Sequence, residues 1–363
     1  MAEISRSQVE LALTGYIDPY LKLDLMTAKA VKDIVVTGNE VTVEVVLGYP
    51  AKGFIPQLVG ELESRIRSIG GVSRAHASVS WDITAHAVQP GVSPLKGVRN
   101  IIAVASGKGG VGKSTTAVNL ALALAAEGAK AGILDADIYG PSQPRMLGIS
   151  TRPESRDGKS MEPVMAHGLQ SMSIGYLIDE ESPMIWRGPM VTQALQQLLG
   201  ETNWRNLDYL VVDLPPGTGD IQLTLSQRIP VSGAIIVTTP QDIALLDARK
   251  GLKMFEKVQV PVLGIVENMS IHICSNCGQA EHIFGEGGGE RMAAQYGVAF
   301  LGGLPLDIRI REDADGGHPS VVADPEGAVA KIYRDIARKT AAALALRARD
   351  FSHKFPNIVI QNT

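Results

Sequence analysis

The chain has 363 residues and a net charge of −4, with 45% hydrophobic and 20% charged residues. These proportions are typical of a folded globular protein and exclude a disordered or collagen-like chain. The slight negative charge argues against a nucleic-acid-binding protein held by bulk electrostatics, and no apolar run reaches the ~18 residues that a membrane span requires. We therefore expect neither a nucleic-acid nor a membrane partner, in a chain whose length suggests about two domains.

Two features of the sequence bear on the compartment. Residues 1–20 contain no basic segment followed by an apolar core, so we expect no secretory signal. The chain has only two cysteines, so a disulfide framework does not hold the fold and a reducing compartment fits. We predict a cytoplasmic protein.

Residues 1–85 predict a small α+β domain. Alternating valines over 40–47 indicate a β-strand, and apolar residues at helical spacing over 53–69 predict an amphipathic helix. A pair of glycines is expected to end that helix. A second strand follows at about 72–81.

A larger domain is expected over 101–350, between a linker at 86–100 that is rich in proline and glycine and a tail at 351–363. Short, continuous apolar runs in it alternate with helical segments, the last of which lies at roughly 325–348. The runs lie at 101–106, 131–137, 208–213, 233–239 and 262–268. This alternation predicts a mostly parallel, doubly wound α/β sheet, in which ligands bind at the carboxyl ends of the strands.

The first of these strands leads into a phosphate-binding loop. Residues 107–114 fit the pattern G-x-x-x-x-G-K-[ST], and a helix is expected to begin near Thr115. Glycines let backbone N–H groups approach a phosphate, and the helix N-terminus adds a favourable dipole. Lys113 would contact the β- and γ-phosphates, and the Ser114 hydroxyl would ligate Mg²⁺. The predicted nucleotide-binding residues of the loop are Gly107, Lys108, Gly109, Gly110, Val111, Gly112, Lys113, Ser114 and Thr115.

The form of the loop carries a more specific signal. GKGGVGKST (107–115) resembles the deviant Walker A motif of the MinD/ParA/nitrogenase-iron-protein class. In that class the early lysine reaches across a dimer interface to the partner's nucleotide. The resemblance implies this role for Lys108 and a homodimer; a solvated surface lysine is the alternative.

Three aspartates lie at the ends of predicted strands beside this loop. Asp213 fits the Walker B role, contacting Mg²⁺ through water. By resemblance to the first switch of the same class, Asp137 is predicted to position the hydrolytic water, and Asp135 could support the Mg²⁺ side. Each could instead cap a helix or a turn.

Both cysteines lie in one C-x-x-C motif, Cys274 and Cys277. This motif alone fits a redox pair, half a zinc site or half a cluster site. A zinc site could recruit His272 and His282. A [4Fe–4S] cluster usually takes four thiolates, and a two-fold dimer would supply the missing two. Two unligated thiols are the remaining alternative.

Taken together, these segments are similar to Mrp/ApbC-type iron–sulfur cluster carriers, which are P-loop ATPases. The matching segments are GKGGVGKST (107–115), DADIYGPS (135–142), WRGPM (186–190), DYLVVDLPPGTGD (208–220), VTTPQDIALLDARKG (237–251), PVLGIVENMSIHICSNCG (261–278), IFGEGGG (283–289), LGGLPLD (301–307) and the turn at 315–317. Residues 1–85 are similar to the small assembly-factor domain often fused ahead of this ATPase. Some members carry a cysteine near the segment at 48–50, and this chain does not, so no metal role is expected for that domain.

The resemblance implies a Mg²⁺-dependent ATPase that holds a labile [4Fe–4S] cluster at a homodimer interface and passes it to apo-proteins, with scaffold proteins as further partners. Asn268 matches the position expected to read adenine, because an amide both donates and accepts. Pro305 and Leu306 are expected to line the base pocket. Arg187 is given no catalytic role.

Two other functions compete with this interpretation. A positioning ATPase like MinD or ParA, with a structural zinc at the cysteine pair, needs a membrane anchor or a basic face, and the tail carries little basic charge. A reductase like the nitrogenase iron protein has its cluster cysteines far apart in sequence, unlike Cys274 and Cys277.

Overall fold

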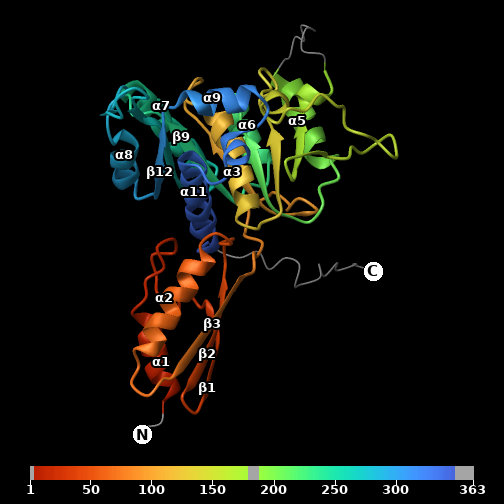
Figure 1. The fold of residues 1–363 in the computed structure, drawn as a ribbon. Helices are drawn as coiled ribbons and strands as arrows, with labels where there is room; N and C mark the ends of the chain where they lie inside the picture. The colour runs from red at the N-terminus through yellow and green to blue at the C-terminus, as the bar shows by residue number, and fades with distance from the viewer. Residues whose placement is uncertain (1–3, 179–187, 348–363) are drawn as a thin grey trace, which may run out of the picture.

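The computed structural model describes residues 4–178 and 188–347 and shows two lobes (Figure 1). The smaller lobe holds the N-terminal elements, and the larger lobe holds a mostly parallel sheet with helices on both faces. Arg187 and the predicted tail at 351–363 lie outside the described residues. Within the described ranges, no helix is long and apolar enough to cross a membrane.

The small lobe is a three-stranded sheet with two helices on one face (Figure 1). Its elements are α1 (Arg6–Thr14), β1 (Val31–Thr37), β2 (Glu40–Leu47), α2 (Ile55–Arg67) and β3 (Arg74–Trp81). β2 is central, antiparallel to β1 and parallel to β3. The strand predicted at 40–47 is confirmed, and its alternating valines are buried in one core with the apolar face of α2.

Three details of the small lobe differ from the prediction, and the first is helix α1, which was not predicted. β1 was not predicted, because its alternation is weak and only Ile34 of its side chains is fully buried. The helix predicted at 53–69 is shorter and ends at Arg67, before the glycine pair. The position of β1 depends on packing, since β1 gains its register from β2 rather than from a local pattern.

The large lobe is built on a nine-stranded sheet. Its parallel strands are β4 (Val98–Ala105), β5 (Ala131–Asp135), β7 (Leu169–Ser173), β8 (Leu207–Asp213), β9 (Gly233–Thr238), β10 (Val262–Ile273) and β12 (Phe300–Pro305). The two antiparallel strands are β6 (Val164–Ala166) and β11 (Ala280–Glu281). The order is β11-β10-β9-β4-β8-β5-β7-β6, with β12 also paired to β10. All five predicted strands are confirmed, and β6, β7, β11 and β12 were not predicted.

Helices cover both faces of this sheet, as the doubly wound prediction requires. The helices of the large lobe are α3 (Lys113–Ala126), α4 (Gln143–Met146), α5 (Gly188–Gly200), α6 (Asp220–Arg228), α7 (Asp242–Lys257), α8 (Gly288–Tyr296), α9 (Ile308–Asp315), α10 (Ser320–Ala323), α11 (Ala328–Ala345) and the 3₁₀-helix η1 (Ile174–Tyr176). Ile102 and Val104 of β4 share a core with α3 and α11. Ile101 and Ala103 point to the other face and share a second core with α6 and α7. The predicted α/β fold class is therefore confirmed.

The segment 86–100, interpreted as a linker, is more structured than expected. β4 begins at Val98, inside this segment, because Val98 and Asn100 pair with β8. Gln89 is buried; its amide oxygen accepts from the Val231 N–H at 3.0 Å, and its amide nitrogen donates to carbonyls at the end of α6. These partners are more than 130 residues away in sequence, so local composition did not reveal them.

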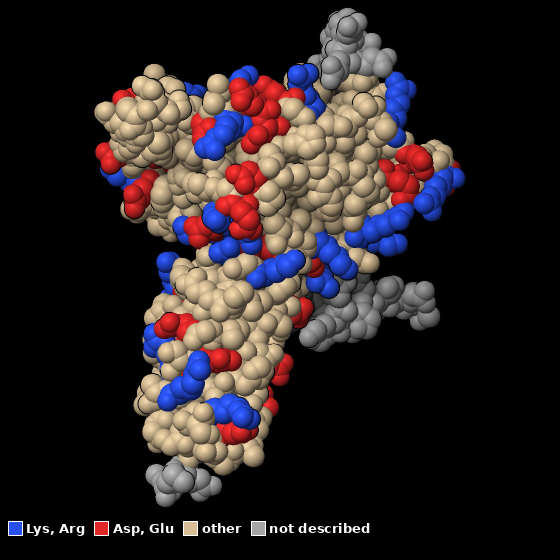
Figure 2. Space-filling model, viewed as in Figure 1, with Lys and Arg blue, Asp and Glu red and all other residues tan. Residues whose placement is uncertain are grey.

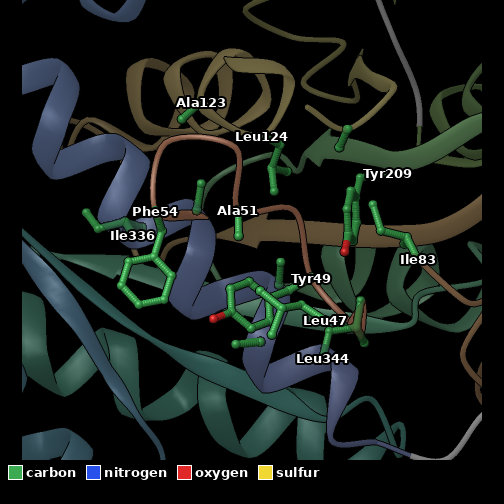
Figure 3. Packing of buried hydrophobic residues seen from close by; sticks show 14 of the residues in the cluster. Leu47, Tyr49, Ala51, Phe54, Ile83, Ala123, Leu124, Tyr209, Ile336 and Leu344 are labelled. Carbon is green, nitrogen blue, oxygen red and sulfur yellow. The ribbon is translucent and has the colours of Figure 1, made fainter. Parts of the chain in front are cut away.

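The two lobes share one hydrophobic core (Figure 3). The buried side chains that join them include Tyr49, Phe54, Leu124, Ile336 and Leu344. Glu127, just after α3, is fully buried and accepts from Arg334 at 2.6 Å, Arg338 at 2.9 Å and the Gly53 N–H at 2.9 Å. Burial would raise the pKa of Glu127, but these hydrogen bonds lower it below its usual range. The small lobe is thereby tied to the helix whose other end begins at the phosphate loop.

Charged side chains of both signs are interspersed over the face of the molecule seen in Figure 2. Several on the small lobe form exposed pairs, such as Arg65 with Glu61 at 2.9 Å. Pairs this exposed contribute little to stability, about 0–1 kcal/mol each. The apolar contacts and the Glu127 cluster, rather than surface pairs, hold the lobes together.

Candidate functional site: a nucleotide site and a cysteine pair

The predicted phosphate loop joins β4 to α3 at the carboxyl edge of the sheet. A Cβ at Gly107 would lie 2.2 Å from the carbonyl carbon of Asp247, so only glycine fits against α7. Gly112 has a φ of 79°, which glycine adopts readily. It precedes α3, whose first turn has no side-chain cap. The N–H groups of that turn are therefore available to a phosphate.

A buried polar cluster lies directly behind the loop. Lys113 Nζ lies 2.5 Å from Asp213 Oδ1 and 3.2 Å from Ser114 Oγ. The side chain of Lys113 is 6% exposed and that of Asp213 is fully buried. Gln143 Nε2 donates to Asp213 Oδ2 at 2.9 Å and to the Ser114 carbonyl oxygen at 3.1 Å. The structure thus brings together the lysine, the serine and the Walker B-type aspartate that the sequence placed on separate segments.

The two aspartates after β5 have different surroundings. Asp135 is fully buried and accepts from the backbone N–H groups of Asp137, Ser142 and Gln143 at 3.0–3.1 Å. Burial, and then the charge of Asp213, raise the pKa of Asp135. These contacts favour the alternative in which Asp135 organises the loop after β5.

Asp137 is half-buried, and the charged groups that act on it are Lys113 and Asp213 of the phosphate site. Burial raises its pKa, the Lys113 ammonium group lowers it, and Asp213 raises it further. Asp137 therefore lies within electrostatic reach of both groups expected at the γ-phosphate and Mg²⁺. This arrangement suits a residue that orients water.

The remaining predicted nucleotide residues lie around the loop. Asn268 Nδ2 donates to the Val111 carbonyl oxygen at 2.9 Å, which places the predicted adenine-reading amide against the phosphate loop. Pro305 ends β12 and pairs with Ile271 of β10, on the same edge of the sheet. Lys108 is half-buried, and its carbonyl oxygen accepts from Ser106 Oγ at 2.9 Å. The roles of these side chains toward a nucleotide or a partner chain stay predictions.

The cysteine pair lies in a tight turn after β10. Gly278 donates to the Cys274 carbonyl oxygen at 2.8 Å, and Cys274 donates to the Gln279 carbonyl oxygen at 2.9 Å. The backbone N–H groups of Cys277 and Asn276 lower the pKa of the Cys274 thiol, and Cys277 is exposed. Because the thiolate is the metal-binding form, the turn prepares Cys274 for ligation.

The histidines beside this turn do not complete a metal site with it. His272 Nδ1 donates to the Leu306 carbonyl oxygen at 3.0 Å, and His282 Nδ1 donates to the Ser270 carbonyl oxygen at 2.8 Å. In the part of the chain that the structure describes, no group of three or more His, Cys, Asp or Glu could hold a metal ion. The Cys₂His₂ zinc alternative is therefore not supported by the arrangement of the described residues.

Sequence reasoning missed one residue of the nucleotide site. Gln143 is 1% exposed and contacts both Asp213 and Ser114, although it follows the matched segment 135–142 and fits none of the motifs. A glutamine at this position gives no signal by itself, because its partners come from β8 and α3.

Two family models match the chain. The model of NUBPL iron-transfer P-loop NTPases matches residues 97–341, and that of iron–sulfur cluster assembly proteins matches residues 6–79. An iron–sulfur cluster carrier protein from Pseudomonas fragi is 61% identical over 278 residues, covering 76% of this chain and 97% of that protein. One from Escherichia coli K12 is 54% identical over 346 residues, covering 94% of this chain and 93% of that protein.

A solved structure agrees with these matches. A nucleotide-binding protein of Archaeoglobus fulgidus in complex with ADP is 38% identical, covers 63% of this chain and 90% of its own, and superposes with a TM-score of 0.55. The family model spans β4 to α11 and includes both the phosphate loop and the cysteine pair. The chain therefore belongs to the NUBPL-type family of iron-transfer P-loop NTPases, as the resemblance to cluster carriers predicted.

Proposed function

We propose that this protein binds and slowly hydrolyses Mg·ATP and carries a labile [4Fe–4S] cluster, which it transfers to apo-proteins. The observation that carries the proposal is the tight turn that holds Cys274 and the exposed Cys277, closed by the hydrogen bond from the Gly278 N–H to the Cys274 carbonyl oxygen at 2.8 Å. Two thiolates per chain are half of what such a cluster usually takes, so a homodimer would complete the site. The named cluster carriers among the relatives support the same cargo. A reducing compartment such as the cytoplasm would keep both thiols free.

The nucleotide site supports ATP hydrolysis through the side chains of this chain. Lys113 neutralises Asp213; bound phosphates would attract Lys113 and release that carboxylate. Ser114 and Asp213 are oxygen donors, which suit Mg²⁺, and the ion would supply charge neutralisation at the phosphates. Asp137 would orient the attacking water, Asn268 and Pro305 would contact the base, and Lys108 would reach the nucleotide of the partner.

Asp137→Ala should retain Mg·ATP binding, because Lys113, Ser114 and Asp213 remain. Hydrolysis should fall by about 10²–10⁴-fold, the usual contribution of a group that positions or deprotonates a nucleophile. Single-turnover hydrolysis measures this loss. Asp135→Ala is the matched comparison, and it should instead lower the melting temperature, because it frees the backbone N–H groups of the loop after β5. If Asp135→Ala has no hydrolytic activity while Asp137→Ala hydrolyses ATP at nearly the wild-type rate, Asp135 rather than Asp137 positions the water.

Anaerobic reconstitution with iron and sulfide tests the cargo. The wild-type chain should become coloured and elute as a dimer with about four irons, the number in one bridged [4Fe–4S] cluster. Mixing it with an apo-enzyme that needs this cluster should restore that enzyme's activity. The transfer is measured once with ATP and once without it. A colourless, zinc-loaded protein would refute the cluster proposal, and a monomer with a complete cluster would refute the bridge.

A further inference from the structure

Gln143 is the residue of the nucleotide site that the nucleotide-binding motifs leave unexplained. It begins α4 and is buried. Its backbone N–H is fixed on Asp135 Oδ2 at 3.0 Å, so the residue is held from both its backbone and its side chain. Its amide nitrogen spans the gap between Asp213 Oδ2 and the Ser114 carbonyl oxygen, at 2.9 and 3.1 Å. Gln143 therefore touches both segments that would hold Mg²⁺.

The partners determine which way the amide points. A carbonyl oxygen and an ionised carboxylate only accept hydrogen bonds, so the NH₂ group must face them and Oε1 must face away. Oε1 is buried and has no hydrogen-bond partner among the described residues, and neither has the neighbouring Ser142 Oγ. Buried polar atoms without a partner are destabilising, and such atoms commonly receive ordered water. The unpartnered Gln143 Oε1 therefore indicates a position where a water molecule would complete the site.

Asp213 needs a second partner once a nucleotide binds. Its Oδ1 is held by Lys113, and under the proposed function that lysine would turn to the phosphates. Asp213 is fully buried, so no bulk water would then orient it. The donor that remains on its carboxylate is Gln143 Nε2. Orientation by a donor of this kind is what tunes carboxylates around metal ions.

We propose that Gln143 is a positioning residue of the Mg²⁺ site: its amide N–H₂ group holds Asp213 in the orientation that receives the hydrated ion, and its Oε1 accepts from a water molecule at the site. This inference rests on the proposed ATP-dependent function. It assigns Gln143 no contact with the phosphates and no part in proton transfer. Its effect is on the affinity for the divalent ion.

Gln143→Met tests this inference, because methionine is close in length and volume but has no polar end. Wild type and variant are loaded with a non-hydrolysable ATP analogue, and Mn²⁺ binding is followed by electron paramagnetic resonance. The variant should bind Mn²⁺ about 10–100-fold more weakly, the usual effect of losing a residue that orients a metal ligand. Analogue affinity without metal should change less than about twofold, because the phosphate loop is intact.

A second variant and a control keep the test decisive. Gln143→Asn keeps an amide but is too short to reach Asp213, so it should show the same weakening if Gln143→Met does not fold. Gln170→Leu is the control, because Gln170 also donates to a backbone carbonyl, that of Arg205 at 2.9 Å, outside the nucleotide site. Its Mn²⁺ affinity should equal that of wild type.

The outcomes separate this inference from the proposed function. Unchanged Mn²⁺ affinity in both Gln143 variants, or equal weakening in Gln170→Leu, overturns the positioning role. A wild-type chain that binds neither the analogue nor Mn²⁺ overturns the proposed ATPase itself.

Discussion

Lys113→Ala is expected to abolish Mg²⁺-dependent ATP hydrolysis. Lys113 is the buried cation at the start of α3, and its removal leaves the phosphates without their nearest positive charge. The loop amides alone would still attract phosphate weakly, so nucleotide binding should weaken and turnover should fall below detection. Phosphate release in a coupled assay measures turnover, and equilibrium dialysis with labelled ATP measures binding. Unchanged turnover in a pure preparation would contradict the assignment of residues 107–114 as the phosphate-binding loop.

The same substitution has a structural consequence that must be separated from catalysis. Lys113 is the cation beside the fully buried Asp213, and removing one partner of such a pair costs about 3–5 kcal/mol. Lys113→Gln keeps a hydrogen-bond donor for Asp213 but no charge, so it should melt closer to wild type while remaining inactive. An active Lys113→Gln variant would show that charge at this position is not required.

Cys274→Ala and Cys277→Ala are each expected to remove most reconstituted iron while leaving ATP binding largely intact. Each substitution would leave a bridged cluster with two thiolates instead of four, and the turn is separate in sequence from the phosphate loop. Iron per chain, visible absorption and ATP binding are the measurements. Cluster retention in either variant would contradict ligation by this pair.

The turn offers controls within a few residues. Ser275→Ala alters the same turn without removing a thiol and should keep the iron. His272→Ala and His282→Ala should also keep it, because in the described residues neither histidine forms a group of three or more possible metal ligands with the cysteines. Loss of metal in the histidine variants, with zinc rather than iron bound in wild type, would restore the zinc alternative.

The sequence by itself determined the features that depend on residues close together in the chain. Five continuous apolar runs became five parallel strands, because strands buried on both faces need apolar side chains at every position. The loop before α3 and the C-x-x-C turn were readable because their chemistry depends on neighbouring backbone amides. Glycine is needed at position 107 because the backbone of α7 approaches it closely, and at position 112 because its φ is left-handed.

Tertiary structure alone decided the features that depend on partners far away in the chain. β1 and the start of β4 take their register from β2 and β8, and Glu127 is stabilised by arginines more than 200 residues away. The sequence indicated that Asp135 could support the Mg²⁺ side, and only the structure showed that its buried carboxylate accepts from backbone N–H groups of the loop after β5. Gln143 became a site residue because α4 places it in contact with both α3 and β8. No local sequence pattern predicts contacts with segments so far away in the chain.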